Sequence, residues 1–302
     1  MAPAADTYRI HLAQIAPALG DLAANLDLHL ARIEAARVDG ARLVVFPELS
    51  LTGYGLQDLV PEVAMDPATG PLLEPIRQAS RRLDVVLGLV EEADEGSLYN
   101  TAAWFSEGRL LARHRKVHLP TYGLFDEGRY FAPGQSVRAF DTPFGRAGLL
   151  VCEDLWHPAL TYVLAQDGTD LLVVISSSPG RGVDDPAMAS QRPWHLLGEA
   201  AARFHTQFVV FVGRVGTEDG QIFGGGSFIY GPDGAQLAAC PLLEEHGISV
   251  DVDRQALRTA RQVNPLRRDD RPALIHRELG RLLASNAGDV ASKTASSPRW
   301  TE

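Results

Sequence analysis

The chain lacks the features that mark secreted and membrane proteins. It has only two cysteines, Cys152 and Cys240, which make no disulfide framework, so a reduced, cytoplasmic protein is expected. No apolar run approaches the ~20 residues of a membrane span, and the N-terminus shows no signal peptide. A formal net charge of −10 argues against nucleic-acid or membrane partners, because both bind basic surfaces. Neither a CxxC nor an HExxH pair occurs, so no metal site and no cofactor are expected.

Lysine is also scarce, because only Lys116 and Lys293 accompany 26 arginines among the 28 basic residues. In a chain that uses arginine for generic positive charge, Lys116 stands among arginines and histidines. Lysine offers a compact ammonium where arginine offers a broad planar fork, so Lys116 is a candidate for a tight site. Sequence drift explains it equally well, and Lys293 in the polar C-terminal segment is an example of drift.

Two other polar residues follow apolar, strand-like runs. Glu48 comes after residues 43–46 and Pro47, at the kind of strand end where sheet proteins build sites. Cys152 follows residues 148–151 and precedes an expected helix at 156–166. That corner puts the thiol beside unpaired N–H groups, which could hold an oxyanion and favour the thiolate. The alternatives are a solvated loop glutamate and a buried structural cysteine.

Together these residues resemble the Glu-Lys-Cys catalytic set of the nitrilase superfamily of carbon–nitrogen hydrolases. Residues 46–59 and 118–131 look most like the glutaminase domain of glutamine-dependent NAD synthetase, and residues 176–179 and 223–227 fall where that subfamily has similar segments. The resemblance covers roughly residues 8–255 and implies a four-layer α-β-β-α sandwich. It also implies a homo-oligomer that associates through the helix at 156–166 and the C-terminal segment.

The resemblance assigns roles to particular residues. It makes Cys152 the nucleophile and Glu48 the general base, with Lys116 and the backbone N–H of Glu153 stabilising the oxyanion. Glu127 matches a second glutamate that positions the lysine and the substrate.

Substrate-binding positions carry over less completely. Tyr122 and Ser178 match substrate-contacting residues, although a packed loop tyrosine and a turn serine are equally good readings. Six residues after Ser178 the relatives carry a basic residue, whereas this chain has Asp184, and Arg181 nearby could substitute. Gly213 stands where the relatives often have Asn. His157, five residues after the cysteine, suggests a Cys-His pair, but the strand–helix corner does not aim it at the thiol.

The pattern of apolar residues predicts one domain over residues 1–284 and a polar, mobile tail over 285–302, with Trp300 docking on a neighbour. Helices are expected from Asp21 to near Gly40 and at 71–83, 156–166 and 193–205. Strands are expected at 8–14, 43–46, 85–90, 99–105, 109–115, 147–151, 171–176, 208–212, 226–230, 235–239 and 248–252.

The expected activity is hydrolysis of a small-molecule amide with release of ammonia, with glutamine as the first candidate substrate. Since the sequence shows no synthetase domain, a glutaminase would pass ammonia to a separate NAD synthetase subunit or release it. The alternative is an ω-amidase or N-carbamoyl amide hydrolase that needs no partner. A non-catalytic regulatory subunit is a third reading, which the complete Glu-Lys-Cys set disfavours.

Overall fold

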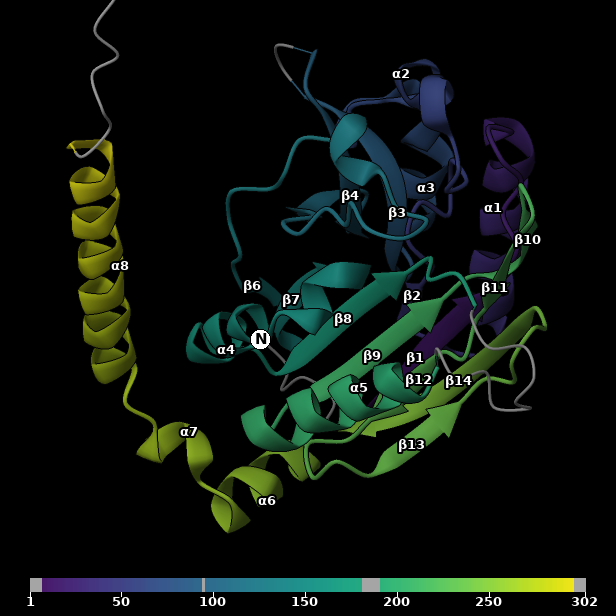
Figure 1. Cartoon of the computed structure of the whole chain (residues 1–302). Coiled ribbons are helices and arrows are strands. Elements are labelled where there is room, and N and C mark those ends of the chain that lie inside the picture. The colour runs from purple at the N-terminus through teal and green to yellow at the C-terminus, as the bar shows by residue number, and fades with distance from the viewer. Residues whose placement is uncertain (1–6, 94–95, 181–190, 296–302) are drawn as a thin grey trace, which may run out of the picture.

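Two six-stranded sheets form the centre of the molecule (Figure 1). The computed structural model describes residues 7–93, 96–180 and 191–295. The first sheet has the order β14-β1-β2-β3-β4-β5, with β1 (Thr7–Gln14), β2 (Leu43–Val45), β3 (Asp84–Glu92), β4 (Leu98–Ser106), β5 (Arg109–Arg115) and β14 (His246–Asp253). The second has the order β13-β12-β9-β8-β7-β6, with β6 (Phe140–Thr142), β7 (Gly145–Val151), β8 (Leu171–Ser176), β9 (Phe208–Gly213), β12 (Phe228–Tyr230) and β13 (Gln236–Ala239).

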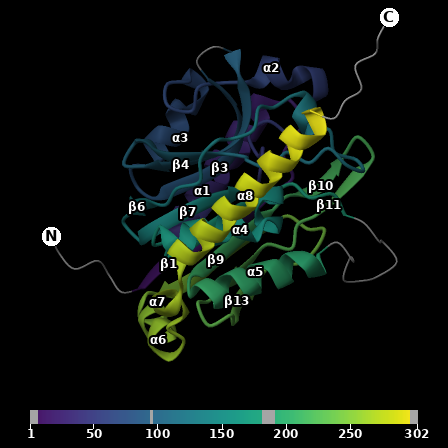
Figure 2. The same cartoon turned by 60° about the vertical axis from the view of Figure 1, so that its left-hand side comes forward.

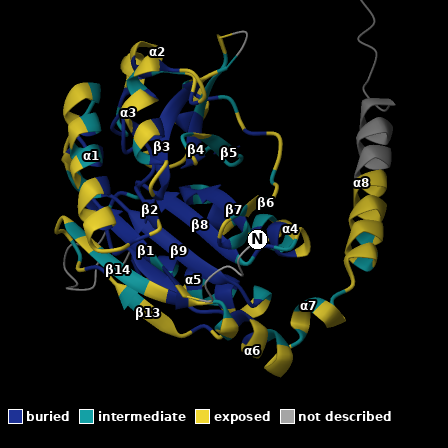
Figure 3. Cartoon of the chain, turned by 180° about the vertical axis from the view of Figure 1, so that it is seen from behind, coloured by how far each residue is buried: buried dark blue, intermediate teal, exposed yellow. Residues whose placement is uncertain are grey.

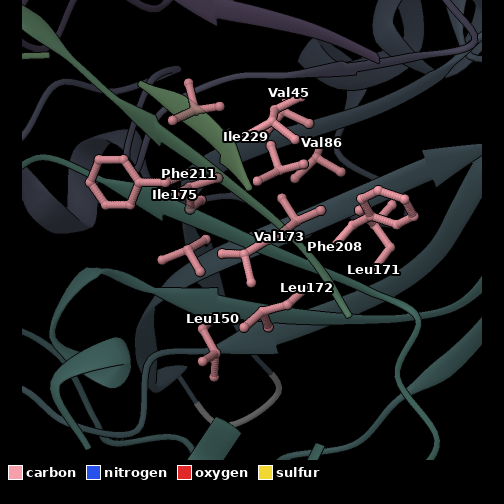
Figure 4. Close-up of a cluster of buried hydrophobic side chains, with 14 of the residues drawn as sticks. Val45, Val86, Leu150, Leu171, Leu172, Val173, Ile175, Phe208, Phe211 and Ile229 are labelled. Atoms are coloured by element: carbon pink, nitrogen blue, oxygen red, sulfur yellow. The ribbon is translucent and has the colours of Figure 1, made fainter. Parts of the chain in front are cut away.

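Alternate side chains of each strand face different layers, which explains why the strands are apolar on both faces. In β2, Leu43 and Val45 join the core between the sheets, while Val44 packs under the outer helices. Figure 4 shows part of the central core, with Val45 from the first sheet and Val173 from the second.

Helices cover the outer faces of both sheets, which completes the four layers. On the first sheet lie α1 (Leu22–Val38) and α3 (Glu74–Ala79), and on the second lie α4 (Pro158–Gln166) and α5 (Arg192–His205). Smaller elements are α2 (Val60–Val63), α6 (Gln255–Val263), α7 (Leu266–Asp269) and the hairpin of β10 (Val215–Glu218) and β11 (Gln221–Gly224). The predicted α-β-β-α sandwich is confirmed.

Two predicted helices differ from the observed ones. The helix expected at 71–83 is a 3₁₀ turn followed by α3, which ends at Ala79, since the chain turns there to enter β3. The helix expected at 156–166 is divided at His157, whose extended backbone separates a 3₁₀ turn, η5 (Cys152–Trp156), from α4. Pro158 occupies the first turn of α4, where its missing N–H costs nothing.

The last helix, α8 (Pro272–Ala295), stands away from the two sheets in Figure 1 and crosses in front of them in the turned view of Figure 2. It continues past residue 284, where the sequence placed the start of a polar tail, and Trp300 lies outside the described residues. Figure 3 shows that the described side chains of α8 are largely exposed, in contrast to the buried strands. Within the described parts of the chain, no helix is both long and apolar enough to cross a membrane.

Candidate active site

Strand direction brings the three candidate catalytic residues to one end of the sandwich. β2 and β3 are parallel, and two antiparallel steps from β3 through β4 make β5 run the same way. Glu48 and Lys116, which follow β2 and β5, therefore lie at the same edge of the first sheet. Cys152 follows β7 of the second sheet, at the edge facing them. All three side chains are buried.

Lys116 lies between two carboxylates. Its Nζ donates to Glu48 Oε1 at 2.8 Å and to Glu127 Oε1 at 2.7 Å. Burial alone would lower the pKa of Lys116, but the negative charges of Glu127 and Glu48 outweigh burial and hold this pKa well above its usual value. The ammonium therefore stays charged inside the protein.

Glu48 is fixed by neighbours that the sequence did not single out. Asn100 on β4 donates from Nδ2 to Glu48 Oε1 at 2.7 Å. The backbone N–H of Ser177 donates to Glu48 Oε2 at 2.6 Å, and the Ser177 hydroxyl donates to the Glu48 carbonyl at 2.7 Å. These contacts tie the glutamate of the first sheet to the end of β8 in the second.

Cys152 sits at a sharp backbone corner. Its φ of +46° is left-handed, a conformation that costs a non-glycine residue free energy and that recurs at functional sites. Ser176 donates its hydroxyl to Cys152 Sγ at 3.3 Å. Burial and the charge of Glu48 raise the pKa of the thiol well above its ordinary value, against the opposing effect of Lys116. This direction is opposite to the expectation that the helix start favours a thiolate.

Glu127 is the second carboxylate on Lys116. Tyr54 donates its hydroxyl to Glu127 Oε1 at 2.7 Å, while Glu127 Oε2 is buried and has no hydrogen-bond partner among the described residues. Burial raises the pKa of Glu127 to about 7, against the lowering effect of Lys116. Tyr54 is a site residue that the sequence analysis missed, although it lies within the motif at residues 46–59.

Asp154 connects the cysteine corner with the segment after the lysine. Its Oδ1 accepts the backbone N–H groups of Val117 at 3.1 Å and His118 at 2.9 Å. Its Oδ2 accepts His114 Nε2 at 2.8 Å and the backbone N–H of Val151 at 3.2 Å. Burial opposes the charge of Asp154, but the His114 bond lowers its pKa, so a fixed anion holds the two segments together.

A cavity of about 330 Å³ opens beside Cys152. Its wall is largely aromatic and proline-rich and also carries Glu153 and Ser178; the lining residues are Pro120, Tyr122, Phe125, Cys152, Glu153, Trp156, Ser178, Pro179, Pro193 and Trp194. The predicted substrate-binding residues Tyr122, Ser178 and Glu153 thus share one cavity. Arg181 and Asp184 lie outside the described residues.

Inside that cavity the Glu153 carboxylate accepts the Tyr122 hydroxyl, with both oxygens at 3.0 Å. The Glu153 backbone N–H comes directly after the thiol, at the start of η5, where N–H groups have no intrahelical acceptor. His157 stacks on His118 with ring centroids 3.4 Å apart and lies 3.9 Å from Glu153, contacts that do not pair it with Cys152. Nowhere in residues 7–93, 96–180 and 191–295 do three His, Cys, Asp or Glu side chains gather as metal ligands would.

Comparisons with known proteins place this geometry in a family. A model of the carbon–nitrogen hydrolase family matches residues 9–262. A glutamine-dependent NAD(+) synthetase from Thermotoga maritima is 32% identical over 86% of this chain, which covers only 44% of that protein. The chain thus spans less than half the length of the synthetases that it matches.

Shorter relatives match along nearly their whole length. Omega-amidase NIT2-B from Xenopus laevis is 32% identical over 88% of this chain and 96% of its own length. A mutant of the amidase from Nesterenkonia sp. AN1, whose active-site cysteine carries the acetamide moiety of fluoroacetamide, is 26% identical and superimposes with a TM-score of 0.73, covering 90% of this chain and 96% of its own. The chain therefore belongs to the carbon–nitrogen hydrolase family and is an enzyme of that family.

Proposed function

We propose that this enzyme hydrolyses the amide bond of a small molecule through a thioester on Cys152. The observation that carries the proposal is the Lys116 ammonium, held between the Glu48 and Glu127 carboxylates within electrostatic reach of the buried thiol. Covalent chemistry at the active-site cysteine of the Nesterenkonia amidase supports it.

In the first half of the reaction, Glu48 takes the thiol proton as Cys152 Sγ attacks the carbonyl carbon. The carbonyl oxygen becomes an oxyanion, which Lys116 Nζ and the Glu153 backbone N–H stabilise. One such donor typically contributes about 10²–10³ in rate. Glu48 then gives the proton to the amide nitrogen, the C–N bond breaks, and ammonia leaves an acyl thioester behind.

In the second half, Glu48 takes a proton from water, which attacks the thioester carbonyl. The C–S bond breaks, the sulfur regains a proton, and the acid leaves. Because the pKa of the Cys152 thiol is raised, proton transfer to a neighbouring base is required for attack rather than optional. Glu127 holds Lys116 in place during both halves.

We propose glutamine as the substrate that the cavity fits best. The Glu153 carboxylate, with the Tyr122 hydroxyl on it and aromatic rings around it, is suited to an ammonium group, which gains from both the anion and the ring faces. Glutamine carries an α-amino group, whereas an ω-amide without an amine leaves that carboxylate unused. Similarity to NAD synthetases points the same way, and similarity to the Xenopus omega-amidase keeps the ω-amide as the alternative.

Ammonia release from three compounds tests the substrate. These are glutamine, glutaramate (the same amide and carboxylate without the amine) and N-carbamoyl-β-alanine. We expect turnover of glutamine to exceed that of glutaramate. Glu153→Gln should lower kcat/KM for glutamine about 10- to 100-fold, the value of a hydrogen bond to a charged group, and leave glutaramate nearly unchanged. Equal losses of kcat/KM on both substrates would show that Glu153 does not bind the substrate's ammonium group. Cys152→Ala should abolish all hydrolysis, whereas the control Cys240→Ala should leave hydrolysis intact.

A glutaminase of this kind supplies ammonia, and we propose a separate NAD synthetase subunit as its acceptor. The support is that the relatives carrying the matching segment are NAD synthetases about twice as long. Absence of glutamine turnover both with and without such a subunit would rule out this version and leave the partner-free amidase.

A further inference from the structure

The β10–β11 hairpin forms a small sheet of its own beside the candidate active site. It begins directly after Arg214, whose backbone N–H donates to the Ser176 carbonyl at 3.0 Å. Ser176 also donates its hydroxyl to the Cys152 sulfur. The root of the hairpin is therefore fixed to the strand end that faces the thiol.

A buried ion pair forms the base of the hairpin. Arg214 Nη1 donates to Glu218 Oε2 at 2.6 Å, and both side chains are buried. The Arg214 guanidinium also lies over the Phe223 ring at 4.1 Å. Isolated buried ions are costly, and such pairs persist where the remaining hydrogen-bonding atoms are satisfied. The second carboxylate oxygen of Glu218 should therefore also have hydrogen-bond donors.

Glu218 Oε1 accepts two backbone N–H groups from the loop after β2. The donors are Gly55 at 2.5 Å and Tyr54 at 3.1 Å. The Tyr54 ring also meets Phe223 edge-on, with centroids 5.9 Å apart. The hairpin thus holds both the backbone and the ring of Tyr54.

Tyr54 connects the hairpin to the catalytic groups through a hydrogen bond. Its hydroxyl donates to Glu127 Oε1, the same oxygen that accepts Lys116 Nζ. Both bonds are 2.7 Å long, so a displaced Tyr54 would leave Lys116 as the remaining hydrogen-bond donor to the Glu127 carboxylate among the described residues.

The second strand of the hairpin also reaches a segment that lines the cavity beside the thiol. Phe223 forms an antiparallel bridge with Pro179, and Gly180 N–H donates to the Ile222 carbonyl at 2.6 Å. Pro179 and its neighbour Ser178 line the cavity beside the thiol. One hairpin therefore contacts both the glutamate side and the substrate side of the site.

We propose that Glu218 and Arg214 are positioning residues, which hold the Tyr54 hydroxyl on Glu127 and so keep the Glu127–Lys116 pair aligned with the substrate cavity. This inference rests on the proposed amidase function for its kinetic readout only. The titratable groups that interact with Glu127 are Lys116, Glu48, Tyr54 and Cys152, and all of them except Tyr54 stay in place in the variants used to test it.

The test compares Glu218→Gln and Tyr54→Phe with Asp84→Asn. The control changes a buried carboxylate that accepts hydrogen bonds from Trp104 and Ser106 and, in the described part of the chain, makes no contact with the site. The first readout is the rate of Cys152 alkylation by iodoacetamide against pH. A plot of that rate against pH should change slope at the pH where Glu127 ionises, because the charge of Glu127 opposes formation of the thiolate. This change of slope is the bend. The second readout is the pH profile of kcat/KM.

We expect the bend to move up by about one pH unit in both site variants, since each removes a hydrogen bond to the charged carboxylate, and to stay in place in Asp84→Asn. Glu218 acts through Tyr54. The double variant Glu218→Gln/Tyr54→Phe should therefore move the bend no further than Tyr54→Phe alone. The proposal would be overturned if Glu218→Gln lost stability without moving the bend. It would also be overturned if the shifts of the two single variants added in the double variant. If no amide is hydrolysed, alkylation still decides the question.

Discussion

At the scale of single residues, the site is a balance of buried charges. One ammonium, Lys116, faces Glu48 and Glu127, and the thiol of Cys152 lies within their electrostatic reach. Two carboxylates around one cation leave a net negative charge, so the thiol resists ionisation and one carboxyl holds its proton to a higher pH. That balance suits a mechanism in which the proton moves from sulfur to carboxylate only during attack.

Glu127 gives a stability prediction with a definite sign. Its pKa is about 7 in the folded protein against 4.5 as an ordinary glutamate, chiefly because it is buried. Between these pH values the folded state binds a proton that the unfolded state has lost, so Glu127 lowers stability as pH rises from about 5 to about 8. Glu127→Gln should therefore gain stability relative to the parent over this range, while losing activity.

Thermal unfolding of both proteins at several pH values measures this gain. Glu34→Gln is the control, since Arg37 lowers the pKa of that exposed carboxyl and gives its contribution the opposite sign. A stability difference between Glu127→Gln and the parent that does not change with pH would contradict the prediction.

At the scale of elements, the corner between β7 and η5 stores strain at the thiol. Cys152 has a left-handed backbone, which glycine adopts freely and alanine does not. Among inactive variants, Cys152→Gly should therefore be more stable than Cys152→Ala, by up to about 1 kcal/mol, or roughly 2–4 °C in Tm. Glycine is normally the less stable choice because it is more flexible when unfolded, so the opposite order would show that the corner relaxes without the thiol.

Sequence alone could predict the residues that end apolar strands. Glu48 and Cys152 each follow a buried run, at the kind of strand end where sheet proteins build sites. Asn100 could not be found this way, because it lies within β4 and its contact with Glu48 depends on how neighbouring strands pair. Tyr54 belongs to a recognised motif, but its partner Glu127 is 73 residues away, and no local pattern links them.

Short secondary-structure elements were harder to predict from the sequence than the long strands. The β10–β11 hairpin has only four residues in each strand, and its polar residues look like a loop. The division of the helix after Cys152 had a visible signal in Pro158, which begins a helix more readily than it continues one. The buried Arg214–Glu218 pair has no signal in the sequence, since charged residues are usually exposed.

At the scale of the whole molecule, α8 has an apolar face without a covering layer. Ile275, Leu279 and Leu282 repeat at helical spacing and are all exposed, on a helix that stands away from the sheets (Figure 1). Val163 on α4 is exposed as well. A stripe of this kind is expected to be buried against something, and most soluble oligomers are symmetric dimers of one chain.

We therefore propose a homodimer in which α8 packs on the partner, and predict its loss in Leu279→Glu/Leu282→Glu. Two charges in an apolar interface are costly to bury, so the double variant should elute as a monomer of about 32.7 kDa in size exclusion with light scattering, whereas the parent elutes near twice that mass. Ala284→Glu adds a charge on the opposite side of the same helix and should leave the dimer intact. If the parent is monomeric at every concentration tested, or if the control dissociates equally, α8 is not the interface.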